Sequence, residues 1–190
     1  MFKQLAVTNR HLVQGPFLEQ LEKICRLPDP PQALILREKD LGEIEYLHLA
    51  QQVLQLCNVY GIPLIIHNFW QIGLLLQCPL HLPLAVLRSA EVQSRRKELG
   101  YIGTSVHSLQ EAQEALACGA DYLVAGHIFT TSCKPGLPPR GVEFLREICS
   151  QVSCPVYAIG GIRLHCQEQQ ELLEQAGAKG GCIMSGYMEY

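Results

Sequence analysis

The stretch Asp121-Tyr122-Leu123-Val124-Ala125-Gly126-His127-Ile128-Phe129 carries the strongest fold signal in this chain. Its apolar first half predicts a buried strand over residues 122–125. Gly126 and His127 follow directly, so the histidine is expected at the exit of that strand. An α/β barrel carries its chemistry at the carboxyl ends of its strands, and an imidazole can take and give a proton near neutral pH. We therefore take His127 as a candidate catalytic residue.

Strand-like and helix-like runs alternate along the chain. Strands are predicted over residues 2–7, 33–36, 63–66, 80–82, 101–104, 122–125, 156–159 and 181–184, and helices over 43–59, 108–118, 142–152 and 167–176. This alternation predicts a compact (β/α)₈ TIM barrel in which residues 1–190 form one domain. An open doubly wound sheet shares the alternation, but the number of strands favours the barrel.

Composition narrows the function classes. The charge is −3, from 15 basic and 18 acidic residues, and no basic run indicates a nucleic-acid partner. The apolar runs are too short to span a membrane, and no signal peptide is recognisable, so a cytoplasmic protein is expected. Nine cysteines without a C-x-x-C motif indicate buried thiols rather than a zinc site or disulfides. The sequence leaves open whether the chain forms a homo-oligomer.

Polar residues follow the predicted strands. Phosphate often binds after strands seven and eight of such barrels, where this chain has Gly160-Gly161 and Met184-Ser185-Gly186. Arg37 and Lys39 alternate along an extended segment, so they point in similar directions and suit an anion, or else form a solvated charge cluster. His67, His81 and His107 are expected in structural or supporting roles. The candidate substrate-binding residues are Arg37, Lys39, Ser105, Thr131, Lys134, Gly160, Gly161, Met184 and Ser185.

Taken together, the motifs resemble the thiamine phosphate synthase superfamily, and more closely its TenI-type branch, the thiazole tautomerases. The resemblance rests on Leu36-Arg37-Glu38-Lys39, Gly103-Thr104-Ser105-Val106-His107-Ser108, the stretch quoted above, Ala158-Ile159-Gly160-Gly161-Ile162 and Met184-Ser185-Gly186. In the synthases, the resemblance places magnesium-binding carboxylates after strands three and four. This chain has His67-Asn68 at the first position and no acid after His81-Leu82 at the second. It also has Gly126-His127 where synthases usually have Gly-Pro.

The resemblance to the tautomerase branch implies an isomerase that moves a proton in a carboxythiazole phosphate, with no metal and no cofactor. His127 would then transfer the proton, and Gly160, Gly161 and Ser185 would hold the phosphate of this small-molecule substrate. Two alternatives stay open. One is a thiamine phosphate synthase, a transferase. The other is a non-catalytic regulatory homologue that binds a phosphorylated ligand.

Overall fold

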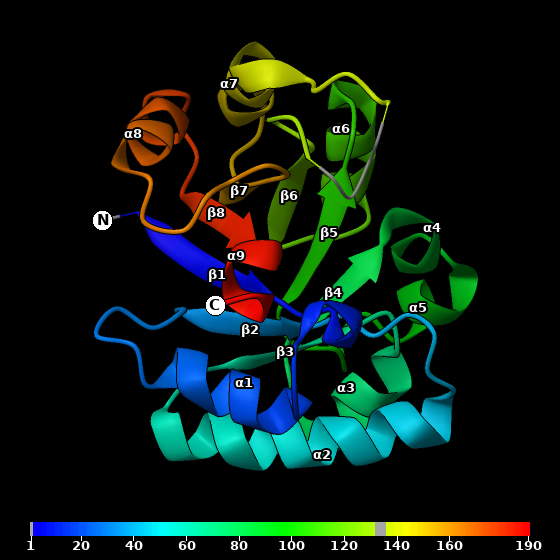
Figure 1. The fold of residues 1–190 in the computed structure, drawn as a ribbon. Helices are drawn as coiled ribbons and strands as arrows, with labels where there is room; N and C mark the ends of the chain where they lie inside the picture. Colours follow the sequence, from blue (N-terminus) through cyan, green and yellow to red (C-terminus); the bar gives the residue numbers. More distant parts are fainter. Residues whose placement is uncertain (1, 132–135) are drawn as a thin grey trace.

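The computed structural model describes residues 2–131 and 136–190. Within them, parallel strands pair in chain order, and β8 returns to pair with β1, which closes the barrel (Figure 1). The strands are β1 (Lys3–Val7), β2 (Ala33–Leu36), β3 (Leu64–His67), β4 (Leu80–Pro83), β5 (Ile102–Val106), β6 (Tyr122–Gly126), β7 (Val156–Ile159) and β8 (Gly180–Ile183). The prediction of a (β/α)₈ barrel is confirmed, and the open sheet is excluded.

Helices surround the barrel, as Figure 1 shows. They are α1 (Phe17–Cys25), α2 (Glu43–Tyr60), α3 (Trp70–Leu76), α4 (Leu84–Leu87), α5 (Ala90–Ser94), α6 (Leu109–Ala117), α7 (Gly141–Gln151), α8 (Gln167–Gln175) and α9 (Ser185–Met188), with a 3₁₀ turn η1 (Arg10–Leu12). Ser108 lies outside α6 and caps it, because its hydroxyl accepts a hydrogen bond from the Glu111 backbone at 3.1 Å. The four predicted helices therefore form, with ends that shift by a residue or so.

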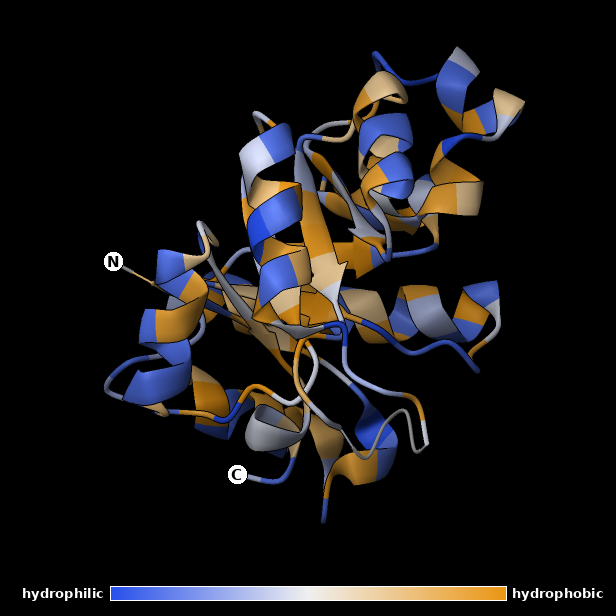
Figure 2. Cartoon of the chain, turned by 90° about the horizontal axis from the view of Figure 1, so that it is seen from above, coloured by the Kyte–Doolittle hydropathy of each residue, from blue (hydrophilic) through white to orange (hydrophobic). Residues whose placement is uncertain are grey.

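Two apolar layers hold the fold together. One fills the barrel, with inward side chains such as Leu5, Ile35, Val124 and Cys182, and the other lies between the strands and the helices. Figure 2 shows mostly hydrophobic central strands, surrounded by helices with both hydrophobic and hydrophilic faces. Burial raises the pKa of the Cys182 thiol to about 12, so this cysteine is an inert packing residue.

Strand β5 extends two residues beyond its predicted end. The sequence predicted a strand over residues 101–104, but Ser105 pairs with Val124 and Val106 pairs with Ala125 in the ladder with β6. Ser105 is therefore fixed by strand pairing rather than placed on a loop.

Among the described helices, none has the length and apolar character that a transmembrane segment needs.

Candidate functional site

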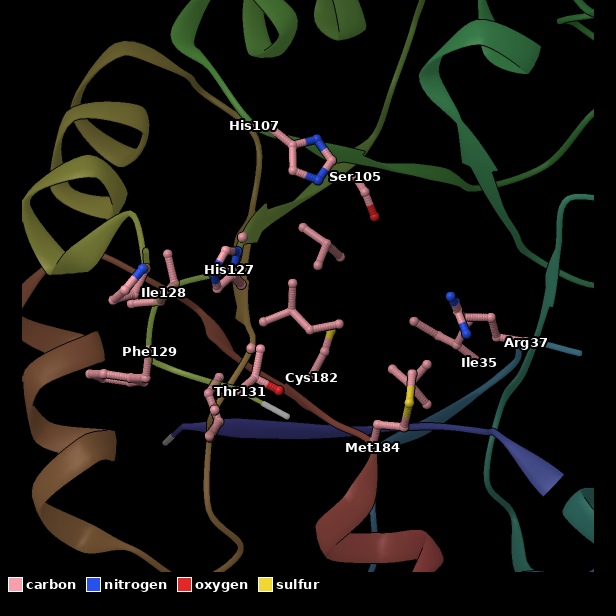
Figure 3. Close-up of a pocket in the computed structure, with 18 of the residues that line it drawn as sticks. Ile35, Arg37, Ser105, His107, His127, Ile128, Phe129, Thr131, Cys182 and Met184 are labelled. Carbon is pink, nitrogen blue, oxygen red and sulfur yellow. The ribbon is translucent and has the colours of Figure 1, made fainter. Parts of the chain in front are cut away.

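A cavity of about 1120 Å³ opens at the carboxyl ends of the strands. Figure 3 shows side chains from several strands around it, among them Arg37, Ser105 and His127. Nearly all predicted site residues line it, namely Arg37, Lys39, Ser105, His127, Thr131, Gly160, Gly161, Met184 and Ser185. Lys134, the remaining candidate, lies outside the described residues. The strand ends thus bring together residues that lie up to about 150 positions apart in the sequence, as parallel barrel topology requires.

Glu38 sets the direction of the two cations after β2. Its carboxylate is 2% exposed and accepts hydrogen bonds from the Thr8 hydroxyl at 2.6 Å and the Arg10 guanidinium at 3.1 Å. The Thr8 hydroxyl in turn accepts a hydrogen bond from the Arg37 backbone at 2.9 Å. Because side chains alternate along an extended segment, anchoring Glu38 away from the cavity turns Arg37 and Lys39 toward it.

His127 is buried at the exit of β6. Its Nε2 lies 3.4 Å from the Leu137 carbonyl oxygen, and its own carbonyl accepts a hydrogen bond from the Arg140 backbone at 2.9 Å. Leu137 and Arg140, which precede α7, therefore pack back against the histidine. This arrangement keeps the imidazole at the edge of the cavity, where Figure 3 shows it.

Gly160 and Gly161 are required for packing of the residues that follow β6, a role that the sequence did not predict. Both have positive φ, at 100° and 68°. A Cβ at Gly160 would lie 2.3 Å from the Cβ of His127, and one at Gly161 would lie 2.3 Å from the Thr130 carbonyl oxygen. The sequence predicted these glycines as a phosphate-binding turn. They make room for the β6 loop, although the glycines also line the cavity.

Two buried histidines form a polar cluster that the sequence analysis gave only a supporting role. His67 and His81 are paired in register on β3 and β4, and their rings stack with centroids 5.9 Å apart. His81 Nε2 lies 2.9 Å from Ser105 Oγ, and its Nδ1 lies 3.1 Å from the Tyr122 hydroxyl. The signal was present in the sequence, because both histidines stand near the end of a predicted strand, but their contact depends on register.

Both histidines are neutral in the folded protein. Burial lowers the pKa of His67 to about 3, with further lowering from His81, Arg37 and Lys39. Burial also lowers the pKa of His81 to about 4, and the positive charge of Arg37 contributes. On this side of the cavity, Arg37 and Lys39 therefore share the wall with two imidazoles that are uncharged at neutral pH.

Comparison with known proteins identifies the family. The family model described as thiamine monophosphate synthase matches residues 4–187. The chain is 34% identical to a thiamine-phosphate synthase of Syntrophomonas wolfei, over 96% of this chain and 86% of the relative. It is 35% identical to a putative thiamine-phosphate synthase 2 of Aquifex aeolicus, over 97% and 96%. The solved thiamine phosphate pyrophosphorylase of Pyrococcus furiosus superposes with a TM-score of 0.78 at 25% identity, covering 99% of this chain and 94% of that one.

These relatives correct the choice of branch. The sequence predicted a thiazole tautomerase, an isomerase, but the relatives from Syntrophomonas wolfei and Aquifex aeolicus are named as thiamine-phosphate synthases, which are transferases. That expectation was wrong because it gave three local differences, at Asn68, after His81-Leu82 and at His127, more weight than the resemblance of the whole chain. The match over residues 4–187 shows that the chain belongs to the thiamine monophosphate synthase family.

Proposed function

We propose that this chain is a thiamine-phosphate synthase, a transferase that joins a phosphorylated thiazole to a pyrimidine diphosphate in the barrel cavity. The volume of the cavity supports this proposal independently of the names of the relatives. Pockets for a single small ligand are typically about 300–1,000 Å³. At about 1120 Å³, this cavity has room for two small substrates in contact, which a joining reaction requires.

The walls suit anionic substrates. Arg37 and Lys39 are directed inward by the anchored Glu38, and they would bind the diphosphate and neutralise the charge that builds on it as it leaves. The glycine loop after β7 and Ser185 after β8 would hold the phosphate of the thiazole. His127 lies beside that loop, where it would contact the thiazole phosphate.

The site does not fit a magnesium ion held by carboxylates. Mg²⁺ prefers oxygen ligands, usually with one or two carboxylates. Of the described residues on the cavity wall, Glu111 is the acidic one, and it accepts a hydrogen bond from the His107 backbone at 2.5 Å. The described part of the chain also contains no group of three His, Cys, Asp or Glu residues able to hold a metal ion. We therefore assign charge neutralisation to Arg37 and Lys39.

The poor fit of the described wall to a carboxylate-held magnesium ion also favours a second candidate function. A homologue that kept the cavity and lost the carboxylates would bind a phosphorylated ligand without joining substrates. This candidate predicts binding without product.

The test is to incubate the purified protein with thiazole phosphate and pyrimidine diphosphate and to measure thiamine phosphate by chromatography. Under the proposal, product forms, and Arg37→Met lowers its rate by about 10²-fold, a usual effect of removing one charge-stabilising group. Arg88→Met is the matched control, because Arg88 is an exposed partner of Glu114. Binding of both substrates without product would support the second candidate. Failure to bind either substrate would contradict both.

A further inference from the structure

One row of residues crosses the barrel beside the cavity, and two of its members, His67 and His81, line it. Strand register pairs His67 with His81, His81 with Gly103, and Gly103 with Tyr122. These residues of β3, β4, β5 and β6 therefore lie at one level of the barrel. Ser105 is two residues beyond Gly103 on the same face of β5, and it lines the cavity.

Gly103 makes room for the phenol ring of Tyr122. A Cβ at Gly103 would lie 2.0 Å from Tyr122 Cζ, so no larger residue fits while the ring stays in place. The space that Gly103 leaves open lets the Tyr122 hydroxyl reach His81 Nδ1 at 3.1 Å. The other ring nitrogen of His81 lies 2.9 Å from Ser105 Oγ. Tyr122, His81 and Ser105 thus form a continuous chain of hydrogen bonds, which we call the Tyr122 relay.

The direction of the protons in the relay follows from burial. Tyr122 is 1% exposed, and burial raises the pKa of its hydroxyl well above 10, so the phenol keeps its proton. Within the described residues, that hydroxyl has His81 as its hydrogen-bond partner. If the phenol only accepted a hydrogen bond, its proton would be buried without an acceptor, which is unfavourable. Tyr122 therefore donates to Nδ1, and the single proton of the neutral imidazole lies on Nε2.

We propose that Tyr122 and His81 are positioning residues that make the Ser105 hydroxyl a hydrogen-bond donor toward the heterocyclic part of the ligand. Because Nε2–H donates to Ser105 Oγ, the hydroxyl proton of Ser105 is left to point into the cavity. Figure 3 places Ser105 across the cavity from Met184, which precedes the proposed phosphate contact Ser185. The donor thus faces a ring atom rather than the phosphate. This inference rests on the proposed function for the identity of the ligand.

The first test needs no ligand and no activity. Nitrogen-15 NMR of histidine-labelled protein reports which ring nitrogen carries the proton. We expect His81 at neutral pH to be protonated on Nε2, and Tyr122→Phe to give a mixture of both forms. Tyr157→Phe is the matched control, because Tyr157 packs edge-on against Tyr122 and is not bonded to His81. A proton on Nδ1 in the unmodified protein would overturn the relay.

The second test measures binding of thiamine phosphate and of inorganic phosphate by calorimetry. Tyr122→Phe and Ser105→Ala should each weaken thiamine phosphate binding about threefold to tenfold, the scale of one net hydrogen bond, and leave inorganic phosphate binding unchanged. The double variant should lose no more than either single variant, because both remove the same donor. Additive losses, or equal losses for inorganic phosphate, would contradict the relay. If the unmodified protein fails to bind thiamine phosphate, the proposed function is wrong, and the NMR result still decides the relay.

Discussion

At the scale of single residues, this cavity depends on small side chains that let its loops pack. Gly160 and Gly161 combine positive φ with close approach of the β6 loop, at distances that no Cβ tolerates. Gly103 does the same for the Tyr122 ring inside the barrel. In each case, the absence of a Cβ leaves the space that a neighbouring loop or ring occupies.

Replacing Gly160 with alanine should therefore disturb His127. The new Cβ would lie 2.3 Å from the Cβ of His127 at a φ of 100°, so we expect unfolding to become easier by about 2–4 kcal/mol. Urea denaturation measures the loss. Gly136→Ala is the matched control, because Gly136 has a φ of 78° and a Cβ added there would meet nothing within 4 Å, so it should lose about 1 kcal/mol. Equal losses would mean that backbone strain, and not the clash with His127, explains the effect.

At the scale of elements, the ends of β3 and β4 bury two imidazoles side by side. Both have folded-state pKa values, about 3 and about 4, below the ordinary value of 6.5. Between these values and pH 6.5 the unfolded chain binds protons that the folded protein does not. Stability from this pair is therefore fully present above pH 6.5 and is lost as the pH falls toward about 4 and then about 3.

The pH dependence of unfolding can be tested on one histidine at a time. Between pH 6.5 and about 5, where most carboxylates stay ionised, each buried histidine should contribute up to about 1.4 kcal/mol per pH unit to the slope. His67→Gln should reduce the slope of unfolding free energy against pH by about this amount, as measured by urea denaturation across the range. His48→Gln, at an exposed position on α2, is the control and should leave the slope unchanged. An unchanged slope in His67→Gln would show that folding does not lower the pKa of His67.

At the scale of the whole molecule, barrel closure places cations and glycine loops around one cavity of about 1120 Å³. The acidic wall residue Glu111 is bonded to His107, and the buried Glu38 is bonded to Arg10. Among the described residues, the cations that line the cavity are Arg37, Lys39 and Arg163, so the charge of the site comes from them rather than from a carboxylate pair.

Ligand binding should accordingly be sensitive to salt and insensitive to magnesium. Chelation should change the affinity for inorganic phosphate by less than about twofold, because the described part of the wall has one carboxylate, Glu111, which is hydrogen-bonded to His107, and no carboxylate pair to hold the ion. Raising sodium chloride should weaken binding, because it screens the attraction of Arg37 and Lys39 for an anion. Calorimetry with magnesium chloride and sodium chloride at matched ionic strength separates the two effects. Tighter binding with magnesium alone would show that the ion joins the site.

The sequence by itself determined the order of strands and helices and most of the cavity wall. Apolar runs such as 156–159 and helix-start residues such as Ser108 are signals between near neighbours, so they can be recognised without a structure. Parallel strands place all their carboxyl ends at one face, so Arg37, His127 and Ser185 were expected at one site, and all three line the cavity. The choice of reaction from Asn68, the missing acid after His81-Leu82 and His127 was wrong, because a few local differences do not outweigh the relatedness of the whole chain.

Only the tertiary structure decided which side chains bond to one another. Glu38 and Arg10 lie 28 positions apart, and His81 and Tyr122 lie 41 apart, so neither pair leaves a pattern in the sequence. The Tyr122 relay exists because barrel closure sets the register of β4, β5 and β6, and a shift of one residue would turn each of these side chains to the opposite face. Local periodicity encodes the strands, but register depends on packing summed over the whole barrel.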